Sequence, residues 1–214
     1  LPEDFEVHLK DKSADENIDI KPDELEKELK DKDDDAYENL YRRPSEEVKQ
    51  KFDKVEQQLR TCLPAEMKDK PNWVIVRTRE NADTGRLEKF LISPVTGKFA
   101  ESDNPETWTD FDTACKYARE NGGVALAYAL DGKDGIACID LDHCVGEDGK
   151  RSALANEVLS KCGKTYIESS VSGKGIHVFG KTEGMDLRSF SKDGDMEFYQ
   201  DSHFIAMTGD GAGY

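Results

Sequence analysis

The chain has 214 residues, 36% of them charged, and a formal net charge of −16. This length suits one sizeable hydrophobic core with an appendage, and no apolar run approaches the roughly 20 residues that a membrane-spanning helix needs. The negative net charge argues against a nucleic-acid partner. However, much of it lies in residues 1–40, which hold 6 basic and 16 acidic residues, whereas residues 41–214 hold 24 basic and 30 acidic residues. The rest of the chain can therefore still bind a polyanion through a local basic patch.

The first 69 residues predict an acidic tail followed by one helix. Residues 1–44 are rich in charge and poor in aromatic side chains, which is typical of a flexible segment, with one short helix around residues 22–32. In residues 45–69, Ser45 suits a helix cap and Pro64 a helix end. The apolar residues between them recur at the intervals of an amphipathic helix: Val48, Phe52, Val55, Leu59 and Cys62. We interpret this helix as a connector that docks on the domain that follows.

Residues 70–214 alternate between strand and helix patterns. We expect strands at residues 73–78 and 87–92, paired across a turn at residues 81–85, and a helix at residues 108–120 with Thr109 as its cap and a stop at residues 121–123. Strands at residues 124–130 and 135–142 flank an Asp131-Gly132 turn, and a second helix at residues 152–162 precedes strands at residues 166–170, 176–180, 196–199 and 204–208. The pattern predicts an α+β fold with a mainly antiparallel sheet and flanking helices.

Two aspartates at the end of an apolar strand are the first candidate for chemistry. Asp140 and Asp142 lie two residues apart, so their side chains project from the same face of a strand. Adjacent anions repel unless a cation lies between them, and oxygen ligands favour Mg²⁺ or Mn²⁺. A strand end with two solvated aspartates explains the spacing equally well, so the spacing alone leaves both readings open.

A second candidate is the short loop Ser172-Gly173-Lys174-Gly175, which is followed by His177 on the next strand. Exposed backbone N–H groups in such a loop can form a nest for a phosphate, and Lys174 adds a positive charge. The loop lacks the GxxxxGK[ST] pattern of a Walker A motif, and a plain hairpin turn is the alternative.

A third candidate is Glu197, which lies in the apolar, aromatic run at residues 196–199. An unpaired carboxylate in such a strand is costly. Either a salt bridge to Arg188 or Lys192 compensates it, or it joins Asp140 and Asp142 as a third metal ligand.

The cysteines indicate a reducing environment. Five cysteines without a CxxC pair favour free thiols, and we expect a cytoplasmic protein. A zinc site formed by Cys138, His143 and Cys144 is conceivable, although its spacing fits no common zinc motif. Because the chain begins with Leu1 and ends after a glycine-rich stretch, we expect a fragment of a longer protein.

The three candidates follow one another in an order that resembles a known family. Asp-hydrophobe-Asp, then Ser-x-x-x-x-His after a small-residue loop, then hydrophobe-Glu is similar to the archaeo-eukaryotic primase superfamily, and more narrowly to the primase-polymerase domains of phages, plasmids and integrated elements. Four further short stretches also resemble recurrent sequence features of that group, at residues 70–73, 94–97, 104–108 and 208–209. The resemblance covers residues 70–209 and leaves the preceding segment without a counterpart.

The resemblance implies a catalytic core related to the RNA-recognition fold and template-directed nucleotidyl transfer. Asp140, Asp142 and Glu197 would hold two Mg²⁺ or Mn²⁺ ions roughly 3.5–4 Å apart. The incoming NTP or dNTP would meet a second group of residues: Ser172, Gly173, Lys174, His177, Tyr199 and His203. Many relatives have Arg where this chain has His203, which would hold a phosphate less firmly. The implied partners are a single-stranded DNA template or primer and a fused or separate replicative helicase.

Other classes account for fewer of these features. In a Toprim-type enzyme a Glu precedes the two aspartates, whereas here Glu197 follows them. A rolling-circle nickase needs a second His two residues from His177, and a Ser/His hydrolase built on Ser172 lacks a GxSxG elbow. The alternative that stays open is a catalytically silent relative that binds DNA or docks a helicase.

Overall fold

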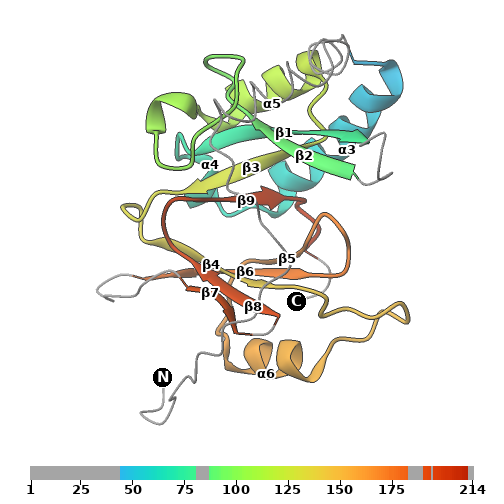
Figure 1. The fold of residues 1–214 in the computed structure, drawn as a ribbon, viewed down its shortest axis with the longest axis vertical. Helices are drawn as coiled ribbons and strands as arrows, with labels where there is room; N and C mark the ends of the chain where they lie inside the picture. The colour runs from blue at the N-terminus through green and yellow to red at the C-terminus, as the bar shows by residue number, and fades with distance from the viewer. Residues whose placement is uncertain (1–43, 81–86, 183–189, 194, 212–214) are drawn as a thin grey trace.

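Two antiparallel sheets organise the chain in a computed structural model that describes residues 44–80, 87–182, 190–193 and 195–211. Within these residues the first sheet has the strand order β2-β1-β3-β9 and the second has the order β5-β6-β4-β8-β7. The strands of the first sheet are β1 (Trp73–Glu80), β2 (Leu87–Ile92), β3 (Ala125–Leu130) and β9 (His203–Met207). Those of the second are β4 (Ile136–Leu141), β5 (Ile167–Ser169), β6 (Ile176–Lys181), β7 (Phe190–Asp193) and β8 (Met196–Tyr199). Figure 1 shows α3 (Glu46–Cys62) and α5 (Phe111–Asn121) with the first sheet and α6 (Ala153–Lys161) with the second.

The helices begin and end where local chemistry places them. Ser45 caps α3 by accepting the Val48 N–H, as predicted, and α3 is followed by the short α4 (Ala65–Lys68). The cap of α5 is Asp110 and not Thr109, because the Asp110 carboxylate accepts the Thr113 N–H; a 3₁₀ turn at Pro105–Thr107 occupies the residues before it. Gly122 ends α5 with φ = 75°, a conformation that suits glycine.

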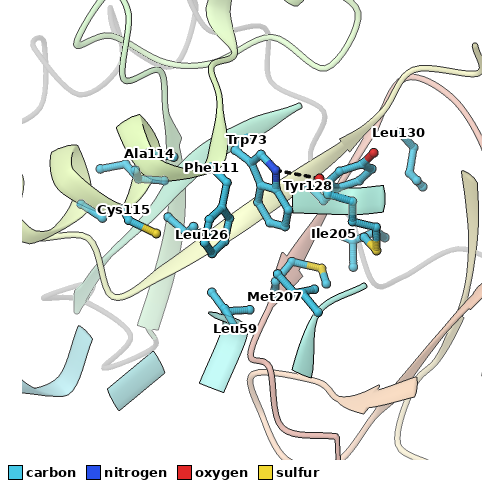
Figure 2. Packing of buried hydrophobic residues seen from close by; sticks show 14 of the residues in the cluster. Leu59, Trp73, Phe111, Ala114, Cys115, Leu126, Tyr128, Leu130, Ile205 and Met207 are labelled. Carbon is cyan, nitrogen blue, oxygen red and sulfur yellow. Dashed lines mark hydrogen bonds between the residues drawn. The ribbon is translucent and has the colours of Figure 1, made fainter. Parts of the chain in front are cut away.

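One hydrophobic core joins α3, α4 and α5 to both sheets. Trp73 on β1 meets Phe111 on α5 and Tyr128 on β3 edge-on, with ring centroids 5.1 and 5.0 Å apart (Figure 2). Phe52 and Leu59 from the amphipathic helix belong to the same cluster, and so do Ile136, Cys138, Phe179 and Tyr199 from the second sheet. Helix α3 thus contributes directly to the core that it shares with both sheets.

The chain changes sheet at the predicted Asp131-Gly132 turn. The two flanking strands are confirmed, but they are not paired, since β3 pairs with β1 and β9 whereas β4 pairs with β6 and β8. Asp131 accepts the N–H groups of Lys133 and Asp134, and Asp134 in turn accepts the N–H of Ile136 and the hydroxyl of Tyr128. These bonds redirect the chain from the first sheet to the second.

The α+β class with antiparallel strands and flanking helices is confirmed. Ser152 caps α6, and β7 is an edge strand that the sequence did not predict. The acidic tail and its short helix lie outside the described residues, and the predicted boundaries at residues 44 and 69 stay predictions. Among the described residues, no helix has the length and apolar character needed to cross a bilayer.

Candidate active site

Four neighbouring strands of the second sheet carry a row of polar side chains at one level. Glu168 on β5 lies opposite His177 on β6, His177 lies opposite Asp140 on β4, and Asp140 lies opposite Glu197 on β8. Residues directly opposite in antiparallel strands point to the same face of the sheet. The structure therefore brings together three of the residues predicted from sequence, Asp140, His177 and Glu197, and adds Glu168.

Asp140 lies at the centre of this row and its carboxylate is incompletely satisfied. Its Oδ1 atom is buried and has no hydrogen-bond donor among the described residues; the His177 Nε2 atom is 3.7 Å away. Burial raises the pKa of Asp140, and the negative charges of Asp142 and Glu197 raise it further, whereas His177 and Lys89 oppose the shift. This is the electrostatic situation that a bound cation would relieve.

Glu197 is buried and hydrogen-bonded at one oxygen. The Tyr199 hydroxyl donates to its Oε2 atom at 2.5 Å, and burial together with this bond raises the pKa of Tyr199. The Tyr199 ring stacks on His203, with centroids 3.6 Å apart and planes 1° apart. Two predicted nucleotide-binding residues, Tyr199 and His203, thus adjoin Asp140 and Glu197, which together with Asp142 we call the acidic row. The alternative partners of Glu197, Arg188 and Lys192, have side chains outside the described residues.

Asp142 lies in the turn that follows β4, where its N–H donates to the Asp195 carbonyl at 2.8 Å. Asp142 is half-buried, and its negative charge helps to raise the pKa of Asp140. Within the described part of the chain, however, no three His, Cys, Asp or Glu side chains are grouped closely enough to hold a metal ion. Asp140, Asp142 and Glu197 fit Mg²⁺ or Mn²⁺ by donor chemistry, and the unsatisfied Oδ1 atom of Asp140 supports that fit.

The cysteines beside this site make local hydrogen bonds. The Cys138 thiol contacts the Ile139 carbonyl at 3.5 Å, and the Cys144 thiol contacts the Leu141 carbonyl at 3.2 Å. His143 is exposed, and its Nδ1 atom lies 3.8 Å from the Oδ1 atom of Asp195.

The loop between β5 and β6 is closed by Ser170. The Ser170 hydroxyl accepts the Gly175 N–H, and the N–H groups of Gly173 and Lys174 donate to the Ser170 carbonyl and the Ser172 hydroxyl. These three amides are therefore engaged inside the loop and do not form an open nest, whereas the Ser172 and Lys174 side chains are exposed.

Gly175 places the loop against the end of β4. A Cβ atom there would lie 2.8 Å from the Leu141 carbonyl oxygen, so only glycine permits this approach. The Lys174 carbonyl also accepts the Val145 N–H at 3.0 Å. The predicted phosphate loop is thereby tied to the segment that carries Asp142.

Glu168 is the residue of this site that sequence reasoning missed. Its side chain is fully buried and 3.1 Å from the His177 Nδ1 atom. Its only sequence signal was an acid in a strand, two residues after Tyr166 and directly before the serine-rich loop.

The sequence of the chain is similar to that of a known protein. No protein-family model matches the chain. Over 143 residues it is 30% identical to the DNA primase-polymerase of Nitratiruptor phage NrS-1, an alignment that covers 64% of this chain and 19% of that protein. The chain is a relative of this primase-polymerase. The resemblance to a phage primase-polymerase is therefore confirmed, and the chain spans about a fifth of the length of the relative that it matches.

Proposed function

We propose that this chain is a nucleotidyltransferase, the DNA primase and DNA polymerase domain of a replication protein from a phage, plasmid or integrated element. The observation that carries the proposal is the cross-strand row of His177, Asp140 and Glu197, with a buried, unsatisfied carboxylate oxygen at its centre, in a relative of a phage primase-polymerase. The proposed substrates are a single-stranded DNA template with its primer and an NTP or dNTP.

The acidic residues would hold divalent metal. Asp140, Asp142 and Glu197 would bind two Mg²⁺ or Mn²⁺ ions, which when bound would activate the attacking hydroxyl and stabilise the leaving pyrophosphate. The chain itself supplies the negative charge: Asp140 from near the end of β4, Asp142 from the turn that follows β4, and Glu197 from the adjacent strand β8. The Tyr199 hydroxyl holds one oxygen of Glu197 and so limits the rotation of that carboxylate.

The nucleotide would bind on the β6 side of the acidic row. Lys174 is exposed at the loop tip and would attract the triphosphate, Ser172 offers a hydroxyl beside it, and His177 faces Asp140 from the strand that leaves the loop. The stacked rings of Tyr199 and His203 border the opposite side of the row. The net charge of −16 makes bound cations and Lys174 important for attracting a polyanion.

A primer-extension assay tests the proposal. The purified protein is incubated with Mg²⁺ or Mn²⁺, a primed single-stranded template and either NTPs or dNTPs, with an unprimed template to detect priming. We expect incorporation by the wild type and its loss in the double variant Asp140→Ala with Asp142→Ala. Asp148→Ala, which removes an exposed carboxylate paired with Lys150, is the matched control and should retain activity. A protein that neither binds divalent metal nor incorporates nucleotide, with a double variant that behaves identically, would refute the enzyme proposal, and such a null result is repeated with the full-length protein. Metal-independent activity, or equal activity in the double variant, would refute the assignment of Asp140 and Asp142 as metal ligands.

One observation favours a second candidate, a catalytically silent domain that binds DNA or docks a helicase. In the described residues the carboxylates are not gathered into a three-residue metal site. A silent domain would bind single-stranded DNA equally well with and without the Asp140 and Asp142 carboxylates, and would incorporate no nucleotide in either form. Fluorescence anisotropy with labelled DNA, run beside the extension assay, distinguishes the two candidates.

A further inference from the structure

Among the described residues near the acidic row, Glu168 has the most completely buried charged side chain, and it lies on the same face of the sheet as His177 and Asp140. Its exposed fraction is 0%, and three donors converge on it, one from Tyr166 directly before β5 and two from residues 208–209 after β9. The Tyr166 hydroxyl donates at 2.7 Å, the Gly209 N–H at 2.9 Å and the Thr208 N–H at 3.2 Å. A carboxylate surrounded by donors acts as an acceptor, since in its ionised form it has no proton to give.

This environment decides how His177 is held. The His177 Nδ1 atom lies 3.1 Å from Glu168 Oε1, and because the carboxylate accepts, the shared proton belongs on Nδ1. The other ring nitrogen, Nε2, is then the one that faces Asp140, 3.7 Å from its Oδ1 atom. The Phe179 ring meets the imidazole edge-on, with centroids 6.5 Å apart, and supports the same ring plane.

We propose that Glu168 is a positioning residue that fixes the His177 imidazole with Nδ1 protonated and Nε2 directed to the acidic row. Its effect on nucleotide binding rests on the proposed function, because an imidazole held in one orientation presents the same ring edge to the incoming nucleotide. Carboxylate–histidine pairs set ring orientation in the same way at metal sites.

The same carboxylate connects the histidine to the helical side of the core. Gly209 donates to Glu168 while its backbone passes against α3, where a Cβ atom would lie 2.6 Å from the Leu59 nitrogen. The Thr208 hydroxyl donates to the Ser169 carbonyl at 2.7 Å. This bond holds the segment at residues 208–209 to β5 and does not involve the His177 ring. A structural role in anchoring the segment can therefore be separated from a role in positioning His177.

Two variants make this separation. Glu168→Gln keeps the shape and one acceptor oxygen for the surrounding donors but removes the carboxylate that faces Nδ1. Thr208→Val is the matched control, because it removes an anchor of the same segment and leaves the Glu168–His177 contact in place. Circular dichroism and thermal melting verify that both variants are folded.

The first readout is the nitrogen NMR spectrum of the histidine ring in protein free of metal and nucleotide, at one fixed pH. The His177 signals are assigned by their loss in His177→Gln. We expect a protonated Nδ1 in the wild type and in Thr208→Val, and an altered Nδ1 signal in Glu168→Gln. An unprotonated Nδ1 in the wild type overturns the proposal even if Glu168→Gln does not fold, and so does an identical ring spectrum in the wild type and Glu168→Gln.

The second readout is nucleotide incorporation. Glu168→Gln should raise the KM for the nucleotide by about tenfold with a smaller change in kcat, as expected for loss of a residue that orients a ligand-binding histidine. Thr208→Val should stay within about twofold of the wild type. Equal effects of the two variants on KM would assign Glu168 to anchoring alone. A protein without any incorporation would refute the proposed function, whereas the NMR result would still decide the placement of His177.

Discussion

Replacing Asp140 by Asn should stabilise the metal-free protein while removing its response to metal. The buried Oδ1 atom of Asp140 has no donor, and burial raises the pKa of this carboxyl above its value in the unfolded chain. Protonation therefore stabilises the folded state, and that stabilisation is lost as pH rises through the folded-state pKa. Asn removes the charge at every pH and keeps the shape.

The structure sets the size of this effect. A buried acceptor without a partner costs about 1–3 kcal/mol, and the 20% exposure of the Asp140 side chain places this cost near the lower limit, about 1 kcal/mol. Asn relieves this cost when its NH2 group takes the position of the Oδ1 atom. For a folded region of this size, this corresponds to a rise of about 2–4 °C in Tm. Metal at about a hundred times its Kd would stabilise the wild type by about 2.7 kcal/mol, or about 5–11 °C, and the variant much less.

Thermal melting in EDTA and in Mn²⁺ tests this reasoning. The variant should melt above the wild type in EDTA and below it in Mn²⁺. Asp134→Asn is the control, because burial also raises the pKa of Asp134 but its oxygens accept bonds from Tyr128 and Ile136. That variant should be destabilised by about 1–2 kcal/mol and respond to Mn²⁺ like the wild type. A destabilised Asp140→Asn in EDTA, or equal Mn²⁺ shifts in both proteins, would refute the assignment.

Two further predictions concern the core. Gly209→Ala should lower the free energy of unfolding by about 2 kcal/mol or more in urea denaturation, because φ is +69° and the new Cβ would lie 2.6 Å from the Leu59 nitrogen. Gly149→Ala has a similar φ of +74° but no atom within 4 Å, so it should cost only about 1 kcal/mol, and equal losses would contradict the close-contact argument. Burial raises the pKa of Cys115 to about 12, so iodoacetamide at pH 8 should modify the exposed Cys62 in the native protein and Cys115 only after unfolding. Mass spectrometry of the peptides measures this order, and comparable native rates would contradict the burial of Cys115.

Local signals in the sequence were sufficient for most elements and insufficient for their pairing. The spacing of apolar residues and the Ser45 cap predicted α3 because a helix cap and an amphipathic face are local properties. The Asp131-Gly132 turn predicted two strands, but a turn does not reveal that the second strand leaves the sheet of the first. The cap of α5 was misassigned to Thr109, since Thr109 and Asp110 are both good caps and the 3₁₀ turn before them decides between them.

The candidate site shows the same division. Asp140, His177 and Glu197 were found because their order resembles a family pattern, and strand register then places them side by side. Glu168 was missed because its role depends on donors at Thr208 and Gly209, far along the chain, which no spacing rule connects to it. For the loop amides the sequence left a phosphate nest and a plain hairpin turn open, and in the structure the Ser170 hydroxyl and carbonyl accept two of them.

Register is the property that turns these separate residues into a site. On β6, His177 faces the acidic row, whereas its neighbours Ile176 and Val178 belong to the cluster that packs with α6 on the opposite face. A shift of one residue would exchange these faces and bury the imidazole among apolar side chains. The Ser170-closed loop and the contact of Gly175 with the Leu141 carbonyl oppose such a shift at one end of β6. The residues that hold the loop closed therefore preserve the alignment of His177 with Asp140, in addition to presenting Lys174.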